Sequence, residues 1–170
     1  MSAPGEPLIR LAALADWPGL TEIYNHYVLN TTVTFDIEPF SVEARRPWFE
    51  QFAEAGPYRL LVAEDSSGLA GYACSMRFRV KAAYATSVET SVYLAPDRVG
   101  EGLGAHLYRE LFECLRGEDL HRAYAGVTLP NPASLALHRS QGFRSLGVYR
   151  EVGRKLGRYW DVEWLEKPLG

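Results

Sequence analysis

The sequence has 170 residues, of which 47% are hydrophobic, and its 18 basic and 21 acidic residues leave a net charge of −3. A chain of this length fits one domain and buries roughly 70% of its unfolded surface, so its core needs no disulfide or metal for stability. The acidic balance and the lack of a basic run disfavour a nucleic-acid partner, and no stretch approaches the ~20 apolar residues of a membrane span.

The polar start MSAPGEP lacks the apolar run of a secretory signal, so we expect a soluble cytoplasmic protein with no membrane partner. The two cysteines, Cys74 and Cys114, are far apart in the sequence and form no metal or redox motif. Each lies in an apolar segment, so we expect both to be reduced thiols in the core.

Hydrophobic periodicity, turn residues and helix caps predict an alternation of strands and helices along the chain. The first half is expected to contain, after a loose start over residues 1–7, a strand at 8–13, a helix that Asp16 caps with Pro18 in its first turn, an extended loop at 30–41, a helix that Ser41 caps, and strands at 59–64 and 69–79 joined by the turn 65–68. The second half is expected to contain a strand at 87–95, a helix whose apolar stripe runs from Leu103 to Leu115, a strand at 122–129, a short helix that Asn131 and Pro132 begin, and two strands within 143–169 that are broken around 153–157.

The order of these elements predicts a mixed sheet. A hairpin followed by a third strand, over residues 59–95, favours antiparallel pairing, whereas strand, helix and strand over 87–129 favour a parallel crossover. Helices on both faces would cover such a sheet. The helix after Ser41 would turn an apolar stripe inward, made of Val42, Trp48, Phe49 and Phe52. No repeat and no linker divides the chain, so we predict one domain over residues 1–170.

Three glycines stand directly before the helix that is expected from Leu103, in the stretch PDRVGEGLGA at 96–105. A simple turn is one interpretation, because glycine relieves backbone strain. A dinucleotide site is another, but only about 70 residues follow, and the strand after the helix ends without the acidic residue that should meet the ribose. A loop that binds a nucleoside triphosphate would need Lys-Ser/Thr after the last glycine, and this sequence has none there. A third interpretation is a pyrophosphate held by amides at the helix N-terminus, and the glycines alone leave it level with the simple turn.

Four segments together resemble the GCN5-related N-acetyltransferases, and within them the phosphinothricin (methionine sulfoximine) acetyltransferase group. The glycine stretch corresponds to the family's Gln/Arg-x-x-Gly-x-Gly/Ala loop, with Val99 where the family has Gln or Arg. The other three are the loop NTTVTF with Glu38-Pro39, the acidic strand VETSVYL at 88–94, and LPNPAS at 129–134 followed by His138 and Gly142-Phe143. These segments lie in order, and the similarity runs from residue 9 to about 167, nearly the whole chain.

The resemblance implies an α/β (α+β) protein with the GNAT fold, a mixed, mostly antiparallel sheet of about seven strands flanked by about four helices. It implies acetyl-CoA as cosubstrate, no metal, a small amine acceptor and a homodimer. The residues that it places at the cofactor are the strand backbone at Val92, Tyr93 and Leu94 for pantetheine, the loop Val99, Gly100, Glu101, Gly102, Leu103 and Gly104 for pyrophosphate, and Asn131 and Ser134. Because Val99 offers no polar group, we expect the backbone amides of 100–104 to bind the phosphates, with Glu101 pointing outward.

Acetyl transfer to an amine requires a base, because an alkyl amine is mostly protonated at neutral pH. Glu89 is the first candidate, since strand alternation places residues 89, 91 and 93 on one face and a buried carboxylate is costly without a purpose. An ion pair with Arg77 or an exposed strand end would be the structural alternative. His138 lies where many family members place a tyrosine that protonates the thiolate, and it could donate that proton, help as a base or be structural. Tyr108 borders the core stripe.

The resemblance places Arg77 at the substrate, where a guanidinium suits a carboxylate or a phosphinate, although Arg77 could also be a solvated strand residue. Phe35, Tyr84 and Thr86 would shape the rest of the pocket. The remaining histidines lack metal-ligand spacing and receive no role.

We therefore predict an N-acetyltransferase that moves the acetyl group directly to the α-amine of a small amino-acid-like acceptor. A ternary complex is expected, because neither cysteine has a partner base nearby in the sequence. Two alternatives stay open: the same fold acting on another amine, such as a protein N-terminus or a polyamine, and a non-catalytic acyl-CoA-binding sensor.

Overall fold

The structure, a computed structural model, describes residues 7–170, so the loose start expected at 1–7 lies outside the described residues except for its last position. Seven strands and four α-helices alternate along the chain. In order they are β1 (Leu8–Leu11), α1 (Trp17–Asn30), α2 (Arg46–Glu50), β2 (Leu60–Asp65), β3 (Gly68–Arg77), β4 (Ser87–Leu94), α3 (Leu103–Cys114), β5 (Arg122–Thr128), α4 (Pro132–Ser140), β6 (Arg144–Lys155) and β7 (Arg158–Pro168). Short 3₁₀ turns precede α1, β4 and α3. Among residues 7–170, no helix is both long enough and apolar enough to span a bilayer.

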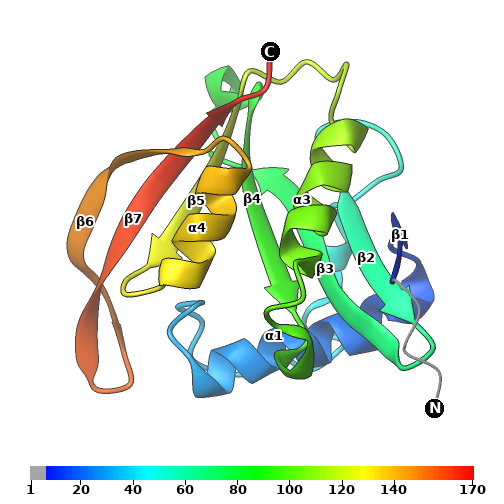
Figure 1. The fold of residues 1–170 in the computed structure, drawn as a ribbon, viewed down its shortest axis with the longest axis horizontal. Coiled ribbons are helices and arrows are strands. Elements are labelled where there is room, and N and C mark those ends of the chain that lie inside the picture. The colour runs from blue at the N-terminus through cyan, green and yellow to red at the C-terminus, as the bar shows by residue number, and fades with distance from the viewer. Residues whose placement is uncertain (1–6) are drawn as a thin grey trace.

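The seven strands form one mixed sheet in the order β1-β2-β3-β4-β5-β7-β6. Every neighbouring pair is antiparallel except β4 and β5, which α3 joins as a parallel crossover. Helices α3 and α4 cover the face that is turned to the viewer in Figure 1, and β6 and β7 form a long hairpin at one end of the sheet. The mixed sheet with its parallel crossover at 87–129 is therefore confirmed.

Each face of the sheet has its own apolar core. On one face, α3 buries its stripe against β2 to β5, with Leu107 and Leu111 fully inaccessible to solvent. Each such buried leucine contributes about 1.5–3 kcal/mol to stability. On the other face, Leu20 and Ile23 of α1 pack against Val62 and other residues of β2 and β3. Both cores cover the middle of the sheet, which fixes the strands that carry the functional groups.

The register of β3 and β4 confirms the expected alternation of residues 88–94. Glu89 lies opposite Met76, and Ser91 opposite Cys74, so these side chains share the α1 face with Tyr93. Val88 is buried in the core under α3, which Val92 and Leu94 also contact. One strand thus carries polar candidate residues on one face and core residues on the other.

Strands β4 and β5 separate after only three paired positions. They pair over Ser87–Glu89 and Arg122–Tyr124, although β4 continues to Leu94 and β5 to Thr128. Figure 1 shows the two strands diverging from that point. The Thr90 hydroxyl donates a hydrogen bond to the carbonyl of Tyr124 at 3.4 Å, at the start of the opening. Beyond it, the β4 edge that faces β5 pairs with no strand among residues 7–170, so its backbone groups remain available to a ligand.

The second helix differs from the sequence prediction. It covers only Arg46–Glu50, and Ser41 instead caps a single preceding turn, where its hydroxyl accepts the N–H of Ala44. Pro47 explains the difference, because a proline fits the first turn of a helix but inside a longer one it lacks an N–H and clashes with the carbonyl four residues earlier. Of the predicted stripe, Trp48, Phe49 and Phe52 contact the core and Val42 does not belong to it.

The Asp16 side chain also differs from its predicted role. Asp16 occupies the N-cap position of α1, but its carboxylate makes no capping hydrogen bond. It accepts the N–H of Ala13 and pairs with Arg10 at 2.7 Å, which ties β1 to the start of the helix. Asn131, by contrast, caps α4 as expected, because its Oδ1 accepts the N–H of Ser134 at 3.0 Å.

Candidate active site

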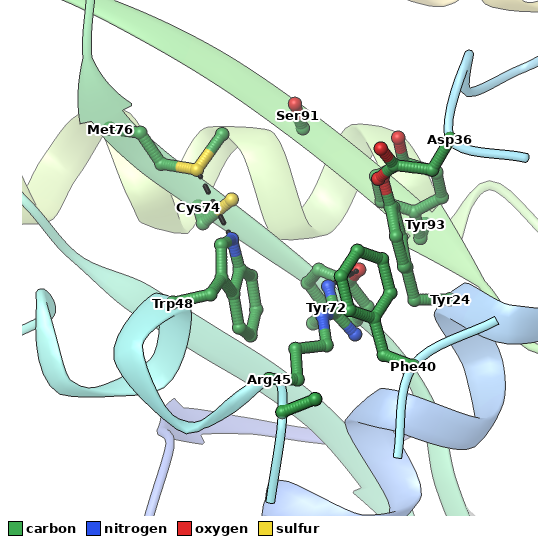
Figure 2. Close-up of a pocket in the computed structure, with 11 residues that line it drawn as sticks. Tyr24, Asp36, Phe40, Arg45, Trp48, Tyr72, Cys74, Met76, Ser91 and Tyr93 are labelled. Atoms are coloured by element: carbon green, nitrogen blue, oxygen red, sulfur yellow. Dashed lines mark hydrogen bonds between the residues drawn. The ribbon is translucent and has the colours of Figure 1, made fainter. Parts of the chain in front are cut away.

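A pocket of about 210 Å³ lies on the α1 face of β3 and β4, under the loop that joins α1 to α2. Aromatic rings from four elements form much of its wall: Tyr24, Trp48, Tyr72 and Tyr93. Ser91 and Cys74 lie between them on the strands, as Figure 2 shows. The pocket is thus largely apolar and contiguous with the face of β4 that carries Glu89.

Glu89 lies two residues before Ser91 on β4, on the same face of the sheet, at the last position where β4 and β5 pair. Its side chain is half-buried, and within residues 7–170 it makes no hydrogen bond or ion pair. Burial raises the pKa of its carboxyl, and the positive charge of Arg79 partly opposes this shift. The expected alternative of an ion pair with Arg77 is absent from the described structure. A desolvated carboxylate with free lone pairs is a stronger base than an exposed one.

The glycine loop leaves open space above the start of α3. Gly100 and Gly102 have φ values of 93° and 78°, and a Cβ atom at either position would meet nothing within 4 Å. Gly102 is the N-cap of α3 and supplies no side-chain cap. The first amides of a helix lack intrahelical partners and carry the positive end of the helix dipole. The positive φ values explain why glycine stands at both positions, as a simple turn would, and the open space beside the amides of the helix N-terminus leaves room for an anion.

Gly104 has a different reason to be glycine. A Cβ there would lie 3.1 Å from a methyl group of Leu137, so its absence lets α3 pack closely against α4. Leu103, the other helical residue of the expected loop, is buried in the core. Among the loop residues, Val99 is 59% exposed and offers no polar group to a phosphate.

Arg98 holds the glycine loop in place through two ion pairs. Its guanidinium donates to Asp65 at 2.6 Å and to Glu101 at 3.1 Å. The Ser67 N–H and then Arg98 lower the pKa of the Asp65 carboxyl. Glu101 is 50% exposed and turned to Arg98, in keeping with the expected outward orientation. Arg98 therefore compensates the charges of both carboxylates that it contacts, Asp65 and Glu101.

His138 is buried on α4 and hydrogen-bonded at both ring nitrogens. Nδ1 lies 2.8 Å from the carbonyl of Ser134, so it donates there, and Nε2 accepts from the Tyr108 hydroxyl at 3.0 Å. Burial lowers the pKa of His138, with the Ser134 carbonyl opposing, and burial raises that of Tyr108. Both groups are therefore neutral near pH 7. Tyr108 lies on the α3 face of the sheet, where the Thr90 hydroxyl is a further partner.

The residues that were expected to bind the acceptor substrate do not line one pocket. Phe35 packs its ring against the backbone of Gly153, and the neighbouring Thr34 carbonyl accepts from the buried Lys155 ammonium at 2.8 Å. The hairpin β6–β7 therefore holds the loop after α1. Tyr84 is exposed and contacts Phe78 edge-on, and the Thr86 carbonyl accepts the N–H of His121.

Arg77 pairs with Val88, so it lies on the sheet face opposite the pocket, and its side chain is exposed. The pocket instead contains Arg45, which is 4% exposed and was not anticipated. The sequence shows it as one of two adjacent arginines before a proline, and nothing in that pattern indicates that it is buried between aromatic rings. Among residues 7–170, no cluster of three or more His, Cys, Asp or Glu side chains could hold a metal ion.

Comparisons with known proteins identify the family and the fold. An acetyltransferase (GNAT) domain model matches residues 9–164. The chain is 56% identical to a phosphinothricin N-acetyltransferase of Streptomyces coelicolor, covering 99% of this chain and 100% of that protein. It is 39% identical to a methionine sulfoximine/methionine sulfone acetyltransferase of Pseudomonas aeruginosa, covering 95% and 94%. Among solved structures, the acetyltransferase yncA of Salmonella typhimurium with acetyl-CoA superposes with a TM-score of 0.91 at 34% identity, covering 98% and 95%.

The splayed strands, the glycine loop and these matches together define an acyltransferase. The chain belongs to the GNAT family of acetyltransferases, has the GNAT fold, and is an N-acetyltransferase. The fold and the enzyme class that the sequence motifs implied are confirmed.

Proposed function

We propose that the protein transfers the acetyl group of acetyl-CoA directly to the α-amine of a small amino-acid-like acceptor, of the phosphinothricin, methionine sulfoximine or methionine sulfone type. The observation that carries this proposal is the unpaired carboxylate of Glu89, at the junction of an apolar pocket and the opening between β4 and β5. The activities named for the relatives support the acceptor class.

The donor would lie across the opening between the strands. Its pyrophosphate would accept hydrogen bonds from the amides around Gly100 and Gly102, and its pantetheine arm would pair with the free backbone edge of Val92 to Leu94. A β4 amide would then donate to the thioester oxygen, and one such donor contributes roughly 3–4 kcal/mol to the transition state. Asn131 and Ser134, which begin α4 beside α3, would border the arm.

Glu89 would take the proton from the acceptor's ammonium group, and the free amine would attack the thioester carbon. The nitrogen of the tetrahedral intermediate would then release its second proton to solvent, and the intermediate would collapse to the amide and expel the CoA thiolate. We propose that the Tyr108 hydroxyl protonates this thiolate and that His138, whose Nε2 lies 3.0 Å from the hydroxyl oxygen, positions it. Cys74 borders the pocket, but burial raises the pKa of its thiol to about 12. A thiol that stays protonated is a poor nucleophile, which supports transfer within a ternary complex.

We also propose that the enzyme is a cytoplasmic homodimer. Strand β6 is the terminal strand of the sheet, and the hairpin that it forms with β7 exposes large apolar residues: Leu146, Val148, Tyr149, Val152, Leu156 and Tyr159. Such an edge favours pairing with a second copy. Light scattering is expected to give about twice the chain mass of 19.1 kDa, and a monomer at assay concentrations would contradict the proposal.

A screen of acceptors tests the proposed reaction. Free thiol release from acetyl-CoA is expected with phosphinothricin, methionine sulfoximine and methionine sulfone, and to a smaller extent with ordinary amino acids. Polyamines and peptides with free N-termini serve as the competing acceptor class. Faster release with either of these would assign the enzyme to another amine, and binding of acetyl-CoA without any turnover would make it a sensor.

A further inference from the structure

Arg45 is a buried cation that forms no ion pair within residues 7–170. Its guanidinium donates to the carbonyl of Leu20 at 2.9 Å and to the hydroxyl of Tyr72 at 3.2 Å. It lies over the rings of Tyr24 and Trp48, at 4.0 and 3.9 Å from their centroids. Within residues 7–170, no carboxylate oxygen comes within 4 Å of it, whereas Arg98 at the glycine loop pairs with Asp65 and Glu101.

The neutral contacts of Arg45 offset only part of the cost of removing its charge from water. Cation–π contacts with two rings recover some of that cost, and two of the five N–H donors of the guanidinium are used. The side chain also borders the pocket, as Figure 2 shows. A guanidinium with spare donors at a cavity wall matches a ligand that carries oxyanion or strongly accepting oxygens.

The position of Arg45 indicates which end of the acceptor it meets. Successive same-face residues of β4 are about 6.6 Å apart, so the pocket wall at Ser91 and Tyr93 leads away from Glu89 by about 6 to 13 Å. In the proposed reaction, the α-amine lies beside Glu89. The α-carboxylate is only two bonds of about 1.5 Å from that amine, so it stays near the pocket mouth. The acceptor side chain, which is longer, extends along Ser91 toward Arg45.

We propose that Arg45 binds the terminal oxygens of the acceptor's side chain, so that the enzyme selects amino acids whose side chains end in a phosphinate, carboxylate or sulfonyl group. The apolar wall formed by Phe40, Cys74 and Met76 fits the methylene stem of such a side chain. This assignment rests on the proposed acetylation of an amino-acid α-amine and adds the group that reads the side chain. The role expected of Arg77 from the sequence then belongs to a different arginine.

Three acceptors of similar length separate the effect of side-chain charge from that of side-chain oxygens. Phosphinothricin has an anionic end, methionine sulfone a neutral end with two oxygens, and methionine a thioether. We compare kcat/KM for each in the wild type, Arg45→Met and Arg45→Lys. In Arg45→Met, the value for phosphinothricin is expected to fall about 10- to 100-fold through KM, that for methionine sulfone less, and that for methionine least. Arg45→Lys keeps the charge without the planar fork and should fall in between. Where methionine turns over too slowly, its inhibition constant against phosphinothricin replaces kcat/KM.

A second variant tests the proposal even if Arg45→Met fails to fold. Tyr72→Phe removes only the hydroxyl that orients the guanidinium, and a smaller loss with the same order of acceptors is expected. An equal loss for all three acceptors with the KM of acetyl-CoA unchanged would assign Arg45 to the shared α-carboxylate and overturn the proposal. A parallel rise in the KM of acetyl-CoA would make Arg45 merely structural and also overturn it. If the wild type releases no thiol with any acceptor, the proposed function itself fails, which is a distinguishable outcome.

Discussion

Replacing Glu89 with glutamine is expected to lower kcat/KM for the acceptor about 100- to 1,000-fold near neutral pH, the range typical of removing a general base. Glutamine keeps the shape of the side chain and the packing on β4 but cannot accept a proton from an ammonium group. Glu89 has no ion pair or hydrogen bond within residues 7–170, so the substitution leaves no buried partner unsatisfied. The loss should therefore appear in the rate and not in the stability.

The pH dependence of this effect distinguishes a base from a structural carboxylate. Burial raises the pKa of Glu89, so the wild-type rate should fall as the pH drops through that raised pKa and the carboxylate becomes protonated. In Glu89→Gln, the rate should instead rise with pH as the acceptor's own ammonium group loses its proton. The difference in rate between the two enzymes should therefore shrink toward about pH 10, where the amine is already neutral. Glu110→Gln, on the solvent side of α3, is the matched control and should stay within about twofold. A pH–rate profile that Glu89→Gln leaves unchanged would remove Glu89 from this role.

Replacing Gly102 with alanine is expected to raise the KM for acetyl-CoA about 10- to 100-fold while the acceptor KM changes little. Gly102 has a φ of 78° at the N-cap of α3, where a Cβ would project into the open space that we assign to the pyrophosphate. The methyl group would keep phosphate oxygens from the loop amides. The backbone strain of an alanine with positive φ, about 1–2 kcal/mol, adds to the effect but acts on stability as well.

Gly117 provides a matched control for that strain. It has a φ of 87°, a Cβ there would also meet nothing within 4 Å, and it lies beyond the opposite end of α3. Gly117→Ala should therefore lose similar stability in urea denaturation without a change in the KM for acetyl-CoA. With an acetyl-pantetheine donor that lacks the pyrophosphate, the two variants should behave alike. Equal donor KM values in Gly102→Ala and Gly117→Ala with acetyl-CoA itself would argue against phosphate binding at the loop.

Local patterns in the sequence were sufficient for much of the fold. Alternation along SVETSVYL correctly placed Glu89 with Ser91 and Tyr93 on one face, because a strand side chain can point only to one side or the other. The cap at Asn131 was also predictable, since a short polar side chain before a proline suits a helix start. The prediction of a helix from Ser41 is wrong, because the apolar residues after it suit a longer helix but Pro47 restricts α2 to Arg46–Glu50.

The main parts of the site that the sequence did not reveal depend on contacts between distant segments. The opening between β4 and β5 is a property of strand pairing, and no residue within either strand marks the position where pairing stops. Arg45 becomes buried only because Tyr24 and Trp48, from two helices, close over it. Tyr108 was placed at the border of the core, and only the packing of α3 against α4 brings its hydroxyl to His138. Such pairings are set by tertiary packing, which local periodicity does not encode.

In the proposed reaction, the acetyl group passes from acetyl-CoA to the α-nitrogen of an amino-acid-like acceptor without forming a bond to the protein. The most direct test incubates the enzyme with acetyl-CoA carrying an isotopically labelled acetyl group, first alone and then with phosphinothricin, and locates the label by NMR and by mass spectrometry of the intact protein. We expect an unlabelled protein in the first incubation and, in the second, label on the α-nitrogen of the acceptor with one free thiol per acetyl group. Label on the protein in the first incubation, or label only in free acetate in the second, would contradict it.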